Sequence, residues 1–536
     1  MNRTTHAIDA LERRTLFAYP ITFGSSSFDS GYRVASTPDG GTVVAGLFTG
    51  TADFDPTSGK TLLTAVGESD GFVARYSSSG ALVWARRFGS DQGDFSQNGF
   101  IDVAIDPARA KHFDQGVGLY PAELGEYANA VNVDSAGNVY LLGGFRGTAT
   151  FGSGRGARTL TSSGGEDFLD IFLLKLNSSG NVTFARSIGG RFTDVAQAMA
   201  LDNSGNIYLT GYFTRIADFD PSSGTTQLTT RGREDIFTAK YNTSGNLVWV
   251  RATDSVETDR VRRAMGNGIA VDASGNVYVA GTFSSETNFT PGVSPRQVIT
   301  ADGETDAFIA KYTNAGTLTY VKSFGGEKFD GATALALGPG GTLYTGAYFE
   351  DVIDVDPGPA VRPQLATPEE LGKSPHFSDL LISKFNAANG TLVWAKPISG
   401  VGWETLGGIA VDSSGNVYST GGFYAPTDFD PGSGRSIRTG TLGVEGFDDP
   451  NDGDRDASYD VFLQKLDSNG RFVAATQFGS RSDDWGLGIA LNASEQPILT
   501  GQFRGAYTFP SSSARLRPVG VQDVFVAIFG TDLRIL

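Results

Sequence analysis

The stretch Val271–Phe283, VDASGNVYVAGTF, decides how the rest of the chain is interpreted, because copies of it recur along the whole sequence. The nearest copies are VDSAGNVYLLGGF at Val133–Phe145, LDNSGNIYLTGYF at Leu201–Phe213 and VDSSGNVYSTGGF at Val411–Phe423, and weaker copies end at Phe48, Phe349 and Phe503. Self-similarity of this kind is the signature of a repeat architecture. We therefore expect copies of one unit rather than several unrelated domains.

A second half follows each copy, and DAFIAKYTNAGTLTYV at Asp306–Val321 is an example of it. It opens with an aspartate, found at Asp70, Asp170, Asp235, Asp306, Asp379, Asp460 and Asp523. A bulky aromatic residue comes later, as Trp84, Trp249, Trp394, Phe184 or Tyr320. We expect the aspartates to accept backbone N–H groups at the entry to a strand. The aromatic residues are expected to pack in the core rather than to form a carbohydrate platform.

One unit is predicted to contain four strands, which in the fourth copy are Gly268–Val271, Asn276–Phe283, Asp306–Tyr312 and Thr317–Phe324. The first two are joined by DASGN and the last two by TNAG, and both contain residues that tolerate turn conformations. In the second strand the residues on both faces are largely apolar, which is typical of a sheet that is covered on both sides. Four-stranded sheets repeated in series indicate propeller blades.

The predicted fold is all-β, a seven-bladed β-propeller of four-stranded blades. The last copy ends without an outer strand, and FAYPITFGS at Phe17–Ser25 matches the missing strand, so we expect an N-terminal strand to close the ring in the last blade. We expect residues 1–16 to form an export-related or disordered segment and residues 17–536 to form a single propeller. Its copies span approximately residues 26–90, 129–190, 195–254, 264–326, 331–400, 405–480 and 485–536, together with the strand 17–25.

The repeat pattern VDxxGNVYxxGxF…DxFxxKYxxxGxLVWxxxFGG resembles the SBBP-type β-propeller repeats of bacteria. The nine residues ALERRTLFA at Ala10–Ala18 resemble the LEPRxLL-type segment of large exported bacterial repeat proteins, with Arg13 in the proline position and Phe17 in a leucine position. These resemblances imply a propeller fold and a secreted or cell-surface protein. They imply no catalytic residues.

Composition excludes several functions. The formal net charge is −17 with a sequence pI near 4.7, which argues against nucleic-acid binding because that requires clustered Lys and Arg. The chain has no cysteine, and only His6, His112 and His376 could supply imidazole. There is no apolar run long enough for a membrane span. We expect a monomer that binds protein or polysaccharide.

The segment TADFDP at Thr51–Pro56 has relatives at Ala217–Pro221, Thr427–Pro431 and Ile353–Pro357. In an extended chain its two aspartates point to one side and the apolar residue to the other. One interpretation is that the carboxylates cap the following turn through the backbone. The other is a calcium site, since calcium prefers hard oxygen ligands. The residues concerned are Asp53, Asp55, Asp218, Asp220, Asp354, Asp356, Asp428 and Asp430.

A second acidic cluster, FDDPNDGDRDASYD at Phe447–Asp460, places Asp452, Asp454 and Asp456 at alternate positions. It resembles the beginning of a calcium loop but lacks the glutamate that such loops carry after the glycine. A solvated acidic loop is the other interpretation. Apart from calcium, the sequence suggests no cofactor.

The connections between second and third strands, and the links between blades, are long and uneven, notably Asp91–Glu126, Gly358–Phe377 and Gly432–Tyr459. Binding residues concentrate on variable loops held by a rigid scaffold, so we expect the protein to bind its partner there without catalysis. The alternative is a propeller enzyme of the lyase or glycoside hydrolase type that uses carboxylates of the same face. His112, near Asp114 and Glu123, and His376 would lie on that face.

Overall fold

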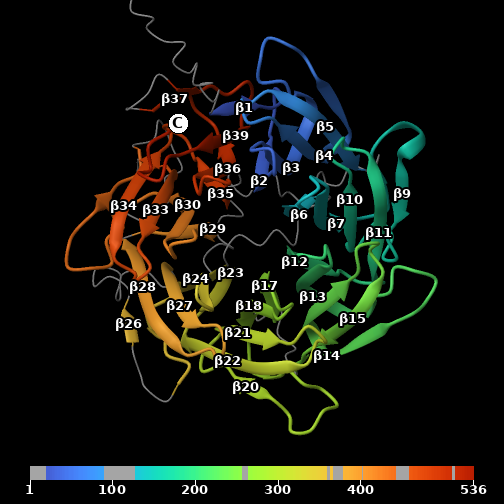
Figure 1. Cartoon of the computed structure of the whole chain (residues 1–536), viewed down its shortest axis with the longest axis vertical. Helices are drawn as coiled ribbons and strands as arrows, with labels where there is room; N and C mark the ends of the chain where they lie inside the picture. The colour runs from blue at the N-terminus through green and yellow to red at the C-terminus, as the bar shows by residue number, and fades with distance from the viewer. Residues whose placement is uncertain are drawn as a thin grey trace, which may run out of the picture.

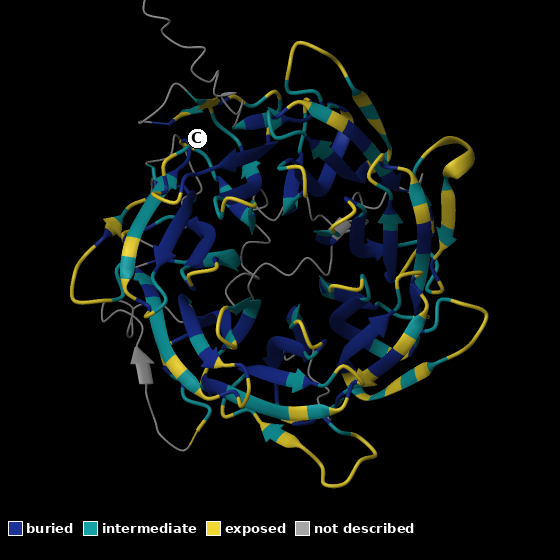
Figure 2. Ribbon diagram, viewed as in Figure 1, coloured by how far each residue is buried: buried dark blue, intermediate teal, exposed yellow. Residues whose placement is uncertain are grey.

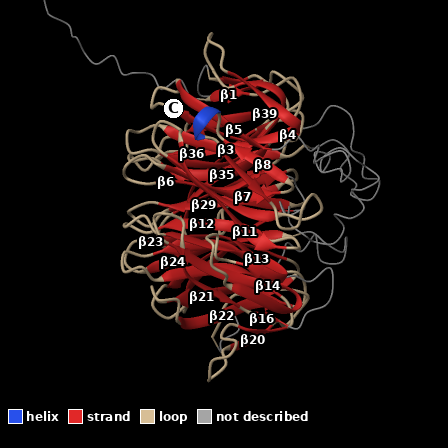
Figure 3. Ribbon diagram, turned by 90° about the vertical axis from the view of Figure 1, so that its right-hand side faces the viewer, coloured by secondary structure: helices blue, strands red, loops and turns tan. Residues whose placement is uncertain are grey.

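The computed structural model describes residues 20–89, 127–255, 264–358, 363–365, 378–400, 402–441, 458–509 and 514–536. In these ranges the regular structure consists of strands, together with a short 3-10 turn at Gly154–Gly156. Figure 1 shows the sheets arranged around a central axis, each with one edge strand innermost. Turned by 90°, the molecule has its strands in the middle and its turns and loops at the two faces (Figure 3). This arrangement is a β-propeller, and it confirms the predicted all-β class.

Antiparallel pairing groups the strands into four-stranded blades, named here from the innermost strand outward. The first blade consists of β2 (Ser30–Ser36), β3 (Thr42–Asp53), β4 (Leu62–Tyr76) and β5 (Leu82–Gly89). The second consists of β6 (Tyr127–Val133), β7 (Val139–Phe145), β10 (Asp170–Leu176) and β11 (Val182–Gly190). The third consists of β12 (Val195–Leu201), β13 (Ile207–Asp218), β14 (Gln227–Tyr241) and β15 (Leu247–Ala252).

The fourth blade consists of β17 (Met265–Val271), β18 (Val277–Phe283), β21 (Asp306–Tyr312) and β22 (Leu318–Gly326). The fifth consists of β23 (Gly331–Gly338), β24 (Thr342–Phe349), β27 (Asp379–Asn386) and β28 (Leu392–Gly400). The sixth consists of β29 (Glu404–Val411), β30 (Val417–Phe423), β33 (Asp460–Leu466) and β34 (Phe472–Phe478). The last described blade is β35 (Trp485–Leu491), β36 (Pro497–Phe503), β39 (Asp523–Ile528) and β1 (Ile21–Phe23).

The hydrophobic core lies between the blades. Every residue of β18 is buried, because both faces of its sheet are covered by neighbouring blades. Tyr208 and Trp249 of one blade, for example, share a buried cluster with Val277 and Phe308 of the next. Burying one such large side chain stabilises the fold by roughly 1.5–3 kcal/mol, so each blade depends on its neighbours for most of its stability.

Polar side chains also join adjacent blades near the axis. Each inner strand contains a register shift at the same position, which is the mark of a β-bulge. At this position Asn129 donates its side-chain amide to the carbonyl of Ala196 at 2.7 Å, and Asn267 donates to Ala332 at 2.9 Å. The acceptor belongs to the next blade in both cases, so the bulge residue links consecutive inner strands.

The aromatic column of the outer strands joins the blades at the perimeter. The indole N–H of Trp84 donates to the carbonyl of Ser178 at 3.0 Å, and that of Trp249 donates to Asn314 at 3.0 Å. Both acceptors lie in the turn between the third and fourth strands of the next blade. Both rings are at least 92 % buried, since their exposed fractions are 7 % and 8 %. The column is core packing, as the sequence predicts.

Between its second and third strands a blade sends out an additional hairpin, and we call these segments clasp hairpins. Most of them pair with the preceding blade, whereas the last described one forms a two-stranded sheet of its own. They are the outer ends of β3–β4 and β13–β14, and the separate pairs β8 (Thr148–Phe151)–β9 (Arg158–Thr161), β19 (Glu286–Asn288)–β20 (Val298–Thr300), β25 (Val352–Asp354)–β26 (Pro363–Leu365), β31 (Thr427–Asp428)–β32 (Ile437–Arg438) and β37 (Tyr507–Thr508)–β38 (Arg515–Leu516). The labels β9, β20 and β26 lie at the outer edge of the ring in Figure 1.

The first arm of a clasp hairpin adds to the end of the preceding blade's outer strand. Ala217 and Asp218 pair with Gly190 and Gly189, and the same geometry joins β8 to β5, β25 to β22 and β31 to β28. In the fourth blade β19 pairs instead with β16 (Asp254–Ser255), which follows the preceding outer strand. Beyond the turn-capping and calcium interpretations that the sequence left open, the ADFDP segments therefore carry the strand that holds one blade to the next.

Glycine is required where the clasp hairpin meets the outer strand. A Cβ on Gly190 would lie 2.0 Å from the carbonyl oxygen of Ile216, and a Cβ on Gly326 would lie 2.0 Å from that of Val352. No side chain fits at these distances unless the backbone moves. The two-glycine end of the FGG pattern and the ADFDP pattern are therefore two halves of one contact.

We predict that Gly190→Ala lowers the free energy of unfolding by about 1–3 kcal/mol, because the new methyl group separates β11 from the clasp hairpin. Gly156→Ala is the matched control, since a Cβ on Gly156 meets no atom within 4 Å. Thermal unfolding of the full chain measures both. Equal melting temperatures for the two variants would contradict the requirement for close approach.

Candidate functional site

The first aspartate of the ADFDP segment closes the tip of its clasp hairpin. Oδ1 of Asp218 accepts N–H groups from Asp220 at 3.0 Å and from Thr226 at 2.8 Å. The equivalent bonds reach Asp53 from Asp55 and Thr61, and Asp428 from Asp430 and Ser436. One carboxylate oxygen thus holds both ends of the loop, which is backbone capping by an aspartate.

The second aspartate caps the following residues in the same way. Oδ1 of Asp220 accepts the N–H of Ser222 at 3.0 Å. The corresponding acceptors are Asp55 for Thr57, Asp356 for Gly358 and Asp430 for Gly432. A Cβ on Gly224 would lie 2.3 Å from Oδ2 of Asp220, so the glycine of the loop leaves room for the carboxylate.

The residue between the two aspartates anchors the loop to the core. Phe219 is completely buried, its ring centroid lies 4.9 Å from that of Phe237, and its carbonyl accepts the hydroxyl of Tyr241 at 3.0 Å. Phe54 makes the equivalent contacts with Phe72 and Tyr76. The aromatic position is therefore required by packing, as the sequence predicts.

The described hairpin tips bring no larger set of metal ligands together. Within the described ranges, no group of three or more His, Cys, Asp or Glu side chains is arranged to hold a metal ion. Asp452, Asp454, Asp456, His112, Asp114, Glu123 and His376 lie outside the described residues. The capping bonds use Oδ1 of each ADFDP aspartate as the acceptor. Calcium binding by these aspartates remains a prediction.

The exposed parts of the clasp hairpins differ from blade to blade, although their anchors are alike. Figure 2 shows exposed hairpins projecting outward around the ring. Several described clasp hairpins carry exposed basic side chains, which are Lys60, Arg155, Arg158, Arg231, Arg233, Arg296, Arg435, Arg515 and Arg517. Some also expose an apolar residue, such as Leu62 (56 %) or Val293 (60 %). Exposed acids, such as Glu68 and Glu286, lie on the same hairpins, so the perimeter displays charges of both signs.

The aspartate column at the start of the third strands is buried and hydrogen-bonded, as predicted. Asp170 accepts the N–H of Ser163 at 2.8 Å, and Asp235 accepts that of Ser255 at 2.8 Å. Desolvation by burial raises the pKa of Asp170, Asp306, Asp460 and Asp523 to about 6, and that of Asp235 to about 7. These carboxyl groups hold protons far more readily than exposed aspartates do.

A second column of buried acids was missed by the sequence reasoning. It consists of Asp29, Asp194, Asp330, Glu404 and Asp484, each at or just before the start of an inner strand. Desolvation raises the pKa of Asp29 and Asp484 to about 7 and that of Asp194 and Asp330 well above the ordinary range. The signal in the sequence was [FI]-G-[GS]-x-x-x-D, found for instance as IGGRFTD at Ile188–Asp194.

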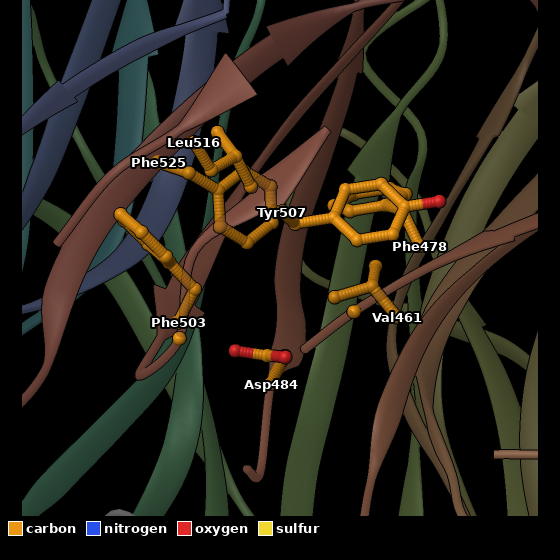
Figure 4. Close-up of a pocket in the computed structure, with 9 residues that line it drawn as sticks. Val461, Phe478, Asp484, Phe503, Tyr507, Leu516 and Phe525 are labelled. Carbon is orange, nitrogen blue, oxygen red and sulfur yellow. The ribbon is translucent and has the colours of Figure 1, made fainter. Parts of the chain in front are cut away.

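A small apolar pocket lies beside one of these acids. Figure 4 shows Phe478, Phe503, Tyr507 and Phe525 around it, with Asp484 at its lower edge. Its remaining lining is Val461, Gly479, Gly505 and Leu516. The pocket sits between the last two described blades, so it belongs to the seam between them.

No protein-family model matches the chain. An uncharacterised WD repeat-containing protein of Acanthamoeba polyphaga mimivirus is 22% identical over 460 residues, which covers 74% of this chain and 31% of that protein. Regulatory protein FlaEY of Caulobacter vibrioides is 26% identical over 170 residues, covering 31% of this chain and 17% of that protein. The chain thus spans less than a third of the length of either relative. WD repeats form propeller blades, in agreement with the fold.

Among solved structures, Sqt1 from Chaetomium thermophilum is similar with a TM-score of 0.41 and 11% identity, covering 95% of this chain and 99% of that one. A protein of unknown function from Bacteroides caccae is similar with a TM-score of 0.29 and 11% identity, covering 76% and 89%. Among the described residues there is no helix with the length and apolarity that a membrane span requires.

We predict that Asp218→Ala lowers the free energy of unfolding by about 1–2 kcal/mol, because two loop N–H groups lose their acceptor. Asp218→Asn keeps an acceptor oxygen and should change stability little. Thermal unfolding in EDTA and in millimolar calcium completes the test, since a ligand of the native state must raise the melting temperature. We expect no shift; a calcium-dependent rise that Asp218→Asn abolishes would establish a calcium site instead.

Proposed function

We propose that the protein is a non-enzymatic binding scaffold built as a closed, seven-bladed propeller. The observation that carries this proposal is the contrast within the clasp hairpins, whose anchors repeat while their exposed tips vary in length and charge. Such variation on a constant, rigid frame is typical of binding surfaces. A WD-repeat relative is consistent with a scaffold of this kind, although its name assigns it no partner.

We place the partner, a protein or a polysaccharide, on the loop-bearing side of the ring and on the clasp hairpin tips. Exposed Arg and Lys on the described tips suit an acidic partner surface, because complementary charge accelerates encounter and favours the correct partner. The chain would act as a monomer. Its resemblance to SBBP repeats, its lack of cysteine and its acidity support a secreted or cell-surface location.

Closure of the ring is part of the proposal. Its support is the pairing of Ile21 with Val526 and of Phe23 with Val524, which gives the last described blade its outer strand from the other end of the chain. Phe23 also packs on Phe54 and Phe72 of the first blade, with ring centroids 5.3 Å and 5.5 Å apart. One strand thus contributes to two blades at the seam.

We predict that deletion of residues 1–25 destabilises the whole ring and that Phe23→Ala costs about 3–5 kcal/mol, the usual range for a buried phenylalanine. Thermal unfolding of the full chain and of both variants measures the loss. Thr22→Ala on the same strand is the control, because Thr22 is only partly buried. A truncated chain that unfolds at the melting temperature of the intact chain would contradict closure by this strand.

Binding to protein and glycan arrays tests the scaffold function. We expect Arg155→Glu combined with Arg435→Glu to weaken binding at least tenfold, since both side chains are exposed on different hairpin tips. Arg471→Glu, an exposed basic residue of a turn between third and fourth strands, is the matched control and should retain binding. Equal binding by all variants, or turnover of an array glycan, would contradict the proposal and favour the enzyme alternative.

A further inference from the structure

Two buried acids from neighbouring blades interact in several seams of the ring, and in two of these seams both meet the same glycine. One is the aspartate that opens a third strand, and the other is the aspartate of the following [FI]-G-[GS]-x-x-x-D segment. The pairs are Asp170–Asp194, Asp306–Asp330, Asp460–Asp484 and Asp523–Asp29, and all eight residues are at most 2 % exposed. We call them the seam pairs.

The geometry of a seam pair is clearest between the second and third blades. A Cβ on Gly189 would lie 2.7 Å from Oδ1 of Asp170 and 3.0 Å from Oδ2 of Asp194. Oδ2 of Asp170 accepts N–H of Ser163, but its Oδ1 has no hydrogen-bond partner among the described residues. This orphaned oxygen is buried and faces the glycine that the second carboxyl group also contacts.

The seam between the last described blade and the first has the same arrangement, and at the other two seams the glycine meets the third-strand acid. A Cβ on Gly24 would lie 2.0 Å from Oδ1 of Asp523 and 2.7 Å from Oδ2 of Asp29. At the remaining two seams, a Cβ on Gly325 would lie 2.4 Å from Oδ1 of Asp306, and a Cβ on Gly479 would lie 2.1 Å from Oδ1 of Asp460. All three Oδ1 atoms, like that of Asp170, are buried without a hydrogen-bond partner.

A proton fits this arrangement better than a metal ion does. Calcium takes six to eight oxygen ligands, whereas Asp194 already uses both oxygens to accept N–H groups from Gly190 at 2.7 Å and Thr214 at 3.0 Å. Two ionised carboxylates buried side by side would repel each other. Adjacent acids of this kind titrate as a pair and keep one proton between them.

We propose that each seam pair is a proton-binding site that stabilises the junction between two blades when it holds one proton. The site lies on the residues that hold the clasp hairpin, since Gly189 and Gly190 pair with Asp218 and Ala217. Loss of the proton therefore weakens both the seam and the docking of the neighbouring hairpin. The inference is independent of the proposed binding function.

Other charges near the seam pairs act mainly in the same direction. Asp302 adds negative charge beside Asp306, and Glu350 adds it beside Asp330. Lys328 lies near Glu350 and lowers the pKa of that residue. Tyr507 lies near Asp460. The first blade differs, because Arg87 forms an ion pair with the third-strand acid Asp70. Burial still raises the pKa of Asp70, but Arg87 lowers it in part, so Asp70 serves as an internal control that has a basic partner.

The sign of the pH dependence follows from the raised pKa values. The folded protein binds more protons than the unfolded chain between the ordinary aspartate pKa, about 4, and about 7, so its stability falls as pH rises through this window. Asp134, Asp202 and Asp272 have the opposite effect, because the stability that they contribute is lost as the pH falls below the ordinary aspartate pKa. Burial would raise their pKa, but hydrogen bonds from Asn138, Asn206 and Asn276 outweigh it and lower the pKa below the ordinary value. Stability is therefore greatest at weakly acidic pH.

Thermal unfolding of the full chain between pH 4.5 and 8.5 tests the proposal. We expect a melting temperature that declines from about pH 5 to pH 8. Asp170→Asn, Asp306→Asn, Asp460→Asn and Asp523→Asn, singly and combined, mimic the protonated form and should raise the melting temperature at pH 8 and flatten the decline. Asp70→Asn should give no such gain, because it removes the partner of Arg87.

A second measurement does not depend on the variants. Infrared spectroscopy of the native chain at pH 7 should show protonated carboxyl groups, and their signal should fall as the Asn substitutions are combined. Three results would overturn the proposal: a melting temperature that rises from pH 5 to pH 8, Asn variants that lose stability at pH 8, or no protonated carboxyl signal. Stabilisation at pH 8 by millimolar calcium, removed by EDTA or by the Asn changes, would replace the proton with a metal ion.

Discussion

The contact between a glycine pair at the end of one outer strand and the clasp hairpin of the next blade is the interaction on which the rest of the structure depends. A single blade exposes two apolar faces and gains stability only when both are covered. At Gly189 and Gly190 the neighbouring strand, the blade's own Asp170 and the following Asp194 all converge. A side chain there would separate all three. Glycine stands at the point equivalent to Gly189 in several blades, as Gly89, Gly325 and Gly479, whereas the third blade has Asp254 there.

Much of the blade could be predicted from the sequence. In the fourth blade the structure places strands at Met265–Val271, Val277–Phe283, Asp306–Tyr312 and Leu318–Gly326, within a few residues of the expected bounds. Local chemistry sets these limits: apolar residues on both strand faces, and turns such as Asp272–Asn276 in which Gly275 has φ +79°. The buried Phe219 position and the aspartate column follow from the same local alternation.

The contacts between blades could not be predicted, because they depend on which distant segments meet. The sequence showed ADFDP as the start of a loop, and nothing local to Asp218 reveals that its strand pairs with Gly189. Asp194 begins to show a role only when the blades are placed, since its partner Asp170 lies in the preceding blade. The hydrogen bond from the bulge residue Asn129 could not be predicted either, because its acceptor, the carbonyl of Ala196, belongs to the next blade.

Repetition itself limits where a unique function can reside. Trp84 and Trp249, and the acids at the seams and hairpin tips, are used by one blade after another for cohesion, so they are poorly suited to a single specific site. Specificity must come from positions that break the repeat. Near the axis, Arg33 is such a break: its Nε donates to Asn129 at 2.9 Å and its Nη1 to Leu487 at 2.8 Å, joining three blades. At the perimeter the breaks are the hairpin tips, which are exposed and free to differ without disturbing the glycine contacts beneath them.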